Sequence, residues 1–178
     1  MKKVIETGVP INMLFSSTIE EKVKKGHPGK LHPWWNRSPI VSSAALLKAA
    51  LDDATQENKD WQFHYTPFIQ SFKDGKAERY PSSDFPTVCD PFAGFGGLVI
   101  AAQRLGLNAF ASDLNPVAIV LNQAAIGIPA RFADQYAVNP KAATMLYHGS
   151  MGLAEDVAYY GEKLAGKVHA KLKEHYPS

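Results

Sequence analysis

The sequence predicts an α/β fold, and three observations lead to this prediction. A short apolar strand ends at Asp90 and is followed by a turn rich in glycine. An apolar helix over 98–105 follows the turn. A second apolar stretch over 107–112 is typical of a strand and ends at Asp113, which comes 23 residues after Asp90. Because two strands joined by a crossover helix form a βαβ unit, we expect the chain to be organised around one such unit.

The glycine turn and the acid after the second strand together indicate a ligand with an adenosyl group. Gly94, Gly96 and Gly97 remove side chains where the backbone turns sharply and is expected to meet a ligand closely. Ligands of open α/β sheets bind at the carboxyl ends of the strands, where a carboxylate can accept hydrogen bonds from ribose hydroxyls. The plainer alternative is a generic βαβ unit in which Asp113 stands by chance.

The spacing of the glycines distinguishes between adenosyl ligands. The dinucleotide fingerprint G-x-G-x-x-G lacks its third glycine here. The turn begins instead with Asp-Pro-Phe-Ala-Gly at 90–94 and resembles motif I, D-P-F-x-G-x-G, of the amino-methyltransferases that use S-adenosyl-L-methionine. The resemblance implies that the cofactor is bound by the following residues of the turn: Asp90, Pro91, Phe92, Ala93, Gly94, Gly96 and Gly97.

The composition sets bounds on size, redox chemistry and location. At 178 residues, 46% of them hydrophobic, the chain is expected to form one globular domain over 1–178. A net charge of +2 is too small to indicate a nucleic-acid partner by itself. The single cysteine, Cys89, is expected in a buried strand and excludes both an internal disulfide and a cysteine-based zinc site within this chain. No apolar run approaches a membrane span, and no secretory segment follows the first residues, so we expect a cytoplasmic protein.

The region 1–53 contains an irregular segment with two adjacent tryptophans. Trp34 and Trp35 are surrounded by glycines and prolines at 26–39, and their rings need burial against the core or a ligand pocket. His27 and His32 have no third ligand of matching spacing, so we expect no metal site. Basic residues between 22 and 37 form either a solvated face or a track for DNA phosphates.

Helix signals of different strength follow the tryptophans. Ser38 is expected to cap a helix that begins at Pro39 and continues to Leu51. Residues 54–86 match no periodic template, so we interpret them as a lid-like insertion or, preferably, a linker with aromatic anchors, with a short helix near 67–73.

The cofactor-binding unit is expected to cover 87–127. Asn115 should cap a helix that starts at Pro116 and stops near Gly127. Residues 128–149 are typical of a loop with a short helix over 141–147. One long helix is expected within 150–176, and its apolar stripe requires a partner surface. The stripe consists of Val157, Gly161, Leu164, Val168 and Leu172.

Four stretches make the chain resemble the N-terminal portion of the adenine-specific DNA methylases that carry a zinc ribbon. They lie at 5–10, at 26–39, at 90–94 with 112–116, and at 152–161. This resemblance implies a Rossmann-like methyltransferase fold, the cofactor S-adenosyl-L-methionine and a DNA partner. The tryptophan stretch resembles motif X, although Ser38 stands where the family usually has arginine. By this resemblance, the cofactor pocket also includes residues outside motif I: His32, Trp35, Arg37, Asp113, Leu114 and Asn115.

The chain also departs from that family. Methyl transfer to adenine nitrogen uses motif IV, [Asn/Asp/Ser]-Pro-Pro-[Tyr/Phe/Trp], and this chain contains no Pro-Pro pair. The zinc ribbon is missing, and only two strands of the expected sheet are recognisable. The fold is therefore expected to be incomplete, comprising the first βαβ unit with N-terminal and C-terminal helices.

These departures leave three interpretations of the chain. We expect the cofactor-binding part of a DNA adenine methyltransferase that is inactive alone, as a fragment, a truncated relative or half of a split enzyme. Its partners would be DNA, through the complete enzyme, and a missing catalytic half, with self-association through the C-terminal helix. A nucleotide-binding oxidoreductase and a non-catalytic scaffold subunit remain alternatives.

Overall fold

A computed structural model describes residues 2–19, 28–30, 32–55, 60–81, 83–145, 147–173 and 175. The chain divides into two compact units, Met1–Ile126 and Gly127–Ser178. The sequence contained no signal for a division at this point. Among the described residues, no helix has the length and apolar character needed to cross a membrane.

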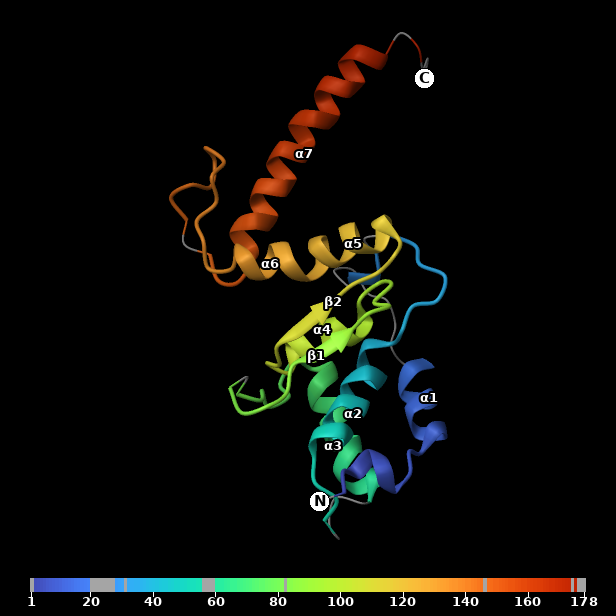
Figure 1. Cartoon of the computed structure of the whole chain (residues 1–178). Coiled ribbons are helices and arrows are strands. Elements are labelled where there is room, and N and C mark those ends of the chain that lie inside the picture. The colour runs from blue at the N-terminus through green and yellow to red at the C-terminus, as the bar shows by residue number, and fades with distance from the viewer. Residues whose placement is uncertain are drawn as a thin grey trace. The chain divides into compact units, whose positions relative to one another are not determined.

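The first unit is a mixture of helices and a small parallel sheet (Figure 1). Strands β1 (Val88–Asp90) and β2 (Ala109–Ala111) pair in parallel, and α4 (Gly97–Arg104) connects them. The predicted βαβ arrangement is therefore present, although β2 is shorter than the expected 107–112. The remaining helices of this unit are α1 (Ile11–Ile19), α2 (Ile40–Leu51), α3 (Trp61–Lys73) and α5 (Pro116–Asn122), with 3-10 turns at Val4–Thr7 and Pro28–Lys30.

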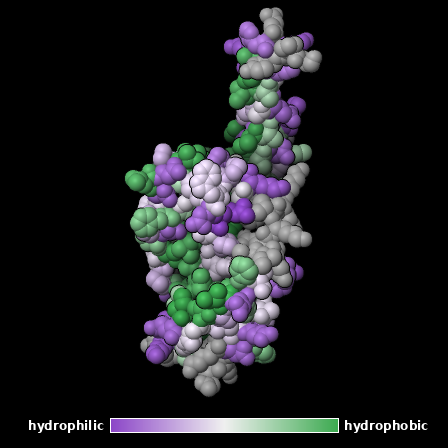
Figure 2. All heavy atoms as spheres, turned by 90° about the vertical axis from the view of Figure 1, so that its right-hand side faces the viewer, coloured by the Kyte–Doolittle hydropathy of each residue, from purple (hydrophilic) through white to green (hydrophobic). Residues whose placement is uncertain are grey.

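The core of the first unit lies around α2. This helix packs against α1, α3 and α4, and its alanines allow those helices to approach closely. Leu14 of α1 is buried, whereas Ile11 and Phe15 are 75% and 64% exposed. Figure 2 shows the resulting hydrophobic patch on the outer face of α1.

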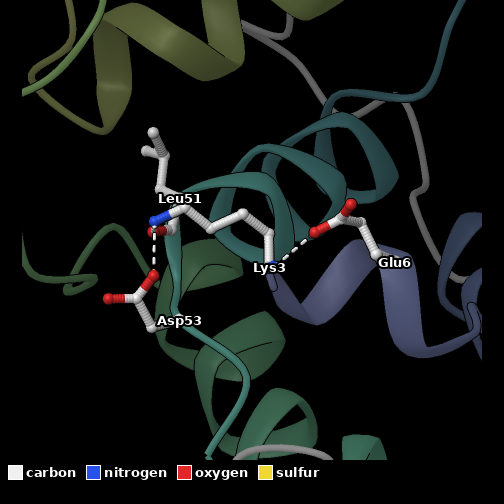
Figure 3. A network of polar contacts seen from close by, with 4 residues as sticks. All are labelled: Lys3, Glu6, Leu51 and Asp53. Carbon is white, nitrogen blue, oxygen red and sulfur yellow. Dashed lines mark hydrogen bonds and ion pairs between the residues drawn. The ribbon is translucent and has the colours of Figure 1, made fainter. Parts of the chain in front are cut away.

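Lys3 forms hydrogen bonds with residues at the end of α2 (Figure 3). Its Nζ donates to the carbonyl oxygen of Leu51 at 2.9 Å and to the carboxylate of Asp53 at 2.7 Å. Its backbone N–H donates to the Glu6 carboxylate at 2.6 Å. The Lys3 ammonium lowers the pKa of Asp53 below its usual value, so the ion pair persists at neutral pH.

The predicted start of α2 was wrong by one residue. Pro39 has ψ of 130°, which is extended backbone, so it precedes the helix and is not its first residue. Its carbonyl oxygen accepts from the backbone N–H of Ser43 at 3.1 Å and from the Ser43 hydroxyl at 2.9 Å. No side-chain hydrogen bond caps this helix, so Ser38 does not have the expected role.

Residues 61–73 form a regular helix, which confirms the helix expected near 67–73 and shows that it begins six residues earlier, in a region interpreted as lacking periodicity. One face of α3 is buried in the core through Trp61, Tyr65, Ile69 and Phe72, at helical spacing. Pro67 lies on the exposed face, where water can satisfy the carbonyl that its missing N–H leaves free. Residues 56–59 and 82 of this region lie outside the described part.

Cys89 is exposed, so the expectation of a buried strand was wrong. Its neighbour on β2, Phe110, is 71% exposed as well. Helix α4 contacts both strands, and in β1 the two neighbours of Cys89, Val88 and Asp90, are less exposed than Cys89. Burial of such a strand depends on what covers the second face of the sheet, which the local sequence does not specify.

Asn115 caps α5 as predicted, because its Oδ1 accepts from the N–H of Val117 at 2.9 Å. The predicted stop near Gly127 was wrong. A π-helical turn over Gln123–Gly127 follows α5 and leads into α6 (Ile128–Arg131). Pro129 lies in the first turn of α6, where its missing N–H does no harm.

The second unit contains α6, a loop region and the long helix α7 (Met151–Leu172), which confirms the predicted long helix. The expected helix over 141–147 is replaced by turns at 140–144, and Leu146 lies outside the described residues. Asn139 shapes these turns because its Oδ1 accepts from the N–H groups of Lys141 and Ala142, both at 3.1 Å.

The stretch 152–161 has a structural role in the second unit. A Cβ on Gly152 would overlap the carbonyl oxygen of Gln135, so only glycine allows this approach. The Asp156 carboxylate accepts from the N–H of Val138 at 2.9 Å and from the N–H of Asn139 at 2.8 Å. These backbone bonds lower the pKa of Asp156.

Candidate functional site

The glycine turn connects the ends of the two strands. The N–H of Ala93 donates to the carbonyl oxygen of Ser112 at 2.9 Å, so the turn is joined to the end of β2. The carboxylate of Asp90 accepts from the N–H of Phe92 at 3.2 Å and shapes the first half of the turn. The predicted motif therefore lies at the carboxyl edge of the sheet, where ligands of α/β folds bind.

Asp113 lies beside the same turn. Its Oδ2 accepts from the N–H of Gly94 at 2.7 Å, and its Oδ1 accepts from the N–H of Asn115 at 2.8 Å. Hydrogen bonds from Asn115 and Gly94 lower the pKa of Asp113, so the carboxylate is charged at neutral pH. Each carboxylate oxygen has a further lone pair that can accept from a ligand hydroxyl.

The glycines of the turn are in contact with the protein itself. Gly94 and Gly96 have φ of +50° and +91°, values that favour glycine. A Cβ on Gly96 would overlap the side chain of Asn122, and a Cβ on Gly97 would overlap the carbonyl oxygen of Ser38. The expectation that these two glycines make room for a ligand is therefore corrected, because atoms of the same chain occupy that space.

Asn122 supports the turn and was missed in the sequence. Its Nδ2 donates to the carbonyl oxygens of Gly94 at 2.9 Å and Ala118 at 2.8 Å. Its Oδ1 is buried and has no hydrogen-bond partner within the described part of the chain. The available signal was a polar residue at the end of an otherwise apolar helix, which is too common to single out a site.

Residues 32–38, named here the tryptophan segment, lie against the glycine turn. A Cβ on Gly94 would come within 3.1 Å of Trp34 Nε1, so the half-buried Trp34 ring lies directly over that glycine. Trp35 is 97% exposed, which is unusual for so large an apolar ring. Residues 26, 27 and 31 of the predicted irregular stretch, including His27, lie outside the described residues.

A cavity of about 160 Å³, named here the turn cavity, connects the tryptophan segment with the start of α5. It is lined by His32, Pro33, Trp34, Trp35, Asn115 and Val117. Three residues predicted for the cofactor site from separate parts of the chain therefore meet: His32, Trp35 and Asn115. Known ligand cavities measure roughly 300–1,000 Å³, so the turn cavity can hold only part of a cofactor.

The other predicted site residues lie around the turn cavity without lining it. Phe92 and Leu114 are 87% and 100% exposed. Arg37 is half-buried, Ala93 is buried, and Pro91 is exposed. No three histidine, cysteine or carboxylate side chains of the described residues are grouped closely enough to hold a metal ion.

Comparison with known proteins gives one match. Residues 10–71 match the model of a family described as a protein of unknown function (DUF1156). No curated protein and no solved structure gave a significant match. The matched range contains the tryptophan segment and ends before the glycine turn, so it covers one side of the turn cavity only.

Proposed function

We propose that the chain is the S-adenosyl-L-methionine-binding part of a DNA adenine-specific methyltransferase. Support comes from the motif I-like run 90–97, from its position at the carboxyl edge of a parallel βαβ unit, and from the charged Asp113 beside it. In this proposal the two strands are the start of a larger Rossmann-like sheet. The proposed cofactor would supply a methyl group activated on a sulfonium centre.

The observation that carries the proposal is the meeting of two distant segments in the turn cavity. Trp35 and Asn115 were assigned to one pocket from the sequence alone, and both line the turn cavity. The nearly complete exposure of Trp35 gives a ring that can stack on a flat or cationic group. Asp113 accepts from the N–H of Asn115, and in this proposal it would also accept from ribose hydroxyls.

Each remaining residue has a defined part in this proposal. Asp113 would bind the ribose, and Trp35 would cover one face of the cofactor. His32 would contribute a ring nitrogen as donor or acceptor to the turn cavity. Asn122 would hold the turn in place through the carbonyl oxygen of Gly94.

The proposed enzyme part would not transfer the methyl group by itself. An amine of adenine must be held by the polar side chain and carbonyl of motif IV while an aromatic ring stacks on the flipped base. The 178 residues contain no Pro-Pro pair. We therefore propose that a second polypeptide region supplies motif IV and the rest of the cofactor pocket.

A second candidate is a non-catalytic subunit that has kept the fold. One observation favours it: both polar groups of Gly94 and both oxygens of Asp113 already have partners within the chain. A scaffold of this kind would bind no methyl donor and would bind a protein partner tightly. A nucleotide-binding oxidoreductase would bind a nicotinamide cofactor instead.

Equilibrium dialysis separates these functions. The chain, Trp35→Ala and Phe110→Ala are each dialysed against S-adenosylhomocysteine and against NAD⁺. We expect binding of S-adenosylhomocysteine by the chain and by Phe110→Ala, a matched loss of an exposed ring away from the turn cavity. Trp35→Ala should lose most of this binding without losing its fold. Binding of NAD⁺ alone, or equal binding by both variants, would contradict the proposal.

A further inference from the structure

A second cavity lies at the end of α4 away from the glycine turn. It measures about 410 Å³ and is named here the arginine cavity. Its lining residues are Phe72, Gly75, Ala77, Arg79, Gln103 and Arg104. Since α4 rises about 1.5 Å per residue, its two ends lie about 10 Å apart. The arginine cavity is therefore separate from the turn cavity.

The arginine cavity is built by the ends of two helices and the loop between α3 and β1. The N–H of Tyr80 donates to the carbonyl oxygen of Leu105 at 2.7 Å and holds the loop against the end of α4. Gly106, with φ of +83°, completes this junction, because a Cβ there would lie 2.6 Å from the Tyr80 carbonyl oxygen. The walls are thus set by backbone contacts.

Arg104 is held in one position beside the arginine cavity. Its guanidinium carbon lies 4.0 Å from the centroid of the Phe72 ring, and its Nη2 donates to the Phe72 carbonyl oxygen. A cation at the C-terminus of a helix is favourable by itself, so this position has a structural reason. Its guanidinium group is planar and charged, and it lies at the wall of the arginine cavity.

The position of Arg79 is not explained by a helix end. It lies in the loop, outside any helix, and its side chain is exposed. Its Cβ and Nε lie 3.2 and 3.4 Å from the position that a Cβ on Gly106 would take, so its stem packs over the glycine junction. Two guanidinium groups and the Gln103 carboxamide therefore line one concave site, and none of the described residues that line it is acidic.

The flanking charges cancel, so the positive charge of the arginine cavity comes from its two arginines. Lys73, the last residue of α3, and Lys76, in the loop that follows, are balanced by Asp74 and Glu78. The Asp74 carboxylate accepts from Nε2 of Gln70, on α3, at 3.1 and 3.2 Å. The guanidinium groups keep their charge at every physiological pH.

We infer that the arginine cavity binds a small ligand carrying a phosphate or diphosphate group. Guanidinium forks match the oxygens of a phosphate in a bidentate manner, and the carboxamide adds a donor for a further oxygen. The volume is at the lower end for ligand sites and suits a small phosphorylated molecule. The inference does not depend on the function proposed above.

Calorimetric titration of the chain with pyrophosphate, in a phosphate-free buffer, tests the inference. Pyrophosphate has no adenosyl group and so does not test the turn cavity. We expect binding that Arg79→Gln weakens at least tenfold. Lys76→Gln, which removes an exposed charge from the same loop, should leave the affinity within twofold, as should Trp35→Ala. Thermal melts of all three variants verify the fold.

Three results would overturn the inference. The first is the absence of binding of both pyrophosphate and inorganic phosphate by the folded chain. The second is an equal loss in Arg79→Gln and Lys76→Gln, which would indicate unspecific attraction. The third is binding of a short DNA duplex, sensitive to Arg79→Gln, without binding of the small anions, which would assign the arginines to a nucleic-acid surface.

Discussion

Replacing Gly97 by alanine would test the contact between the glycine turn and the tryptophan segment. Gly97 is the first residue of α4, and a Cβ there would overlap the carbonyl oxygen of Ser38. The obstructing atom belongs to the backbone, so it cannot move away as the end of a flexible side chain can. Either the start of α4 or the tryptophan segment must therefore shift.

The expected effect is the sum of two opposing terms. Overpacking of a close contact costs about 1–3 kcal/mol. Alanine in place of glycine in a helix gains up to about 1 kcal/mol. We therefore expect Gly97→Ala to lower the free energy of unfolding by about 1–2 kcal/mol. For a unit of this size, that corresponds to a melting temperature lower by roughly 4–8 °C.

Gly166→Ala is the matched control, because no atom lies within 4 Å of the Cβ it would add to α7. It should stabilise the second unit by about 1 kcal/mol. All three tryptophans, Trp34, Trp35 and Trp61, lie in the first unit, so their fluorescence during urea unfolding reports on that unit alone. Circular dichroism follows the helices of both units.

The two glycine variants should differ in the midpoint of urea unfolding. The fluorescence midpoint should fall for Gly97→Ala and stay unchanged for Gly166→Ala, whose gain should be visible by circular dichroism. A midpoint for Gly97→Ala equal to or above that of the unaltered chain would refute the contact between the glycine turn and the tryptophan segment.

Three further predictions concern pH, self-association and activity. Burial and the Asp52 carboxylate raise the pKa of Tyr65. The free energy of unfolding should therefore fall above about pH 10, where Tyr65 ionises in the unfolded chain before it ionises in the folded one. In Tyr65→Phe the midpoint of urea unfolding should depend less on pH between about 9 and 11. Leu164 and Val157, on the apolar stripe of α7, are 63% and 66% exposed. We therefore expect the chain to self-associate and Leu164→Lys to reduce the association. Light scattering that finds a monomer at every concentration would exclude it. The purified chain should incorporate no methyl group into adenine of duplex DNA, and measurable incorporation of labelled methyl would show that motif IV is dispensable.

The sequence predicted the βαβ unit well because local residues set its limits. Glycine at 94 and 96 permits left-handed backbone, Gly106 ends α4, and Asn115 caps α5. Each of these effects acts within a few residues, so it can be recognised without knowledge of the rest of the fold. The prediction that His32, Trp35 and Asn115 belong to one pocket came from the family resemblance instead.

The errors concern effects that depend on distant residues. Only the second half of α3, near 67–73, was predicted. Its first half was missed because the buried face mixes aromatic residues with Ile69 and because Pro67 interrupts the pattern on the exposed side. The exposure of Cys89 depends on what covers the sheet. The neighbours of Gly96 and Gly97 come from Asn122 and Ser38, and no local rule connects these positions.

The arginine cavity also depends on residues that are distant in the sequence. Arg79 and Arg104 are separated by the strand β1 and the whole of the glycine turn in the sequence, and neither belongs to a recognisable motif. The hydrogen bond between Tyr80 and Leu105 brings their segments together.

Calorimetric titration of the purified chain with S-adenosylhomocysteine tests the central claim most directly. The Asp113→Ala variant is titrated alongside, and circular dichroism verifies that both proteins are folded. We predict that the chain binds S-adenosylhomocysteine and that the variant does not, because the variant lacks the carboxylate that holds the glycine turn and that would accept from the ribose. A folded chain that releases no heat of binding, or a variant that keeps the full affinity, would contradict a methyl-donor site at the glycine turn.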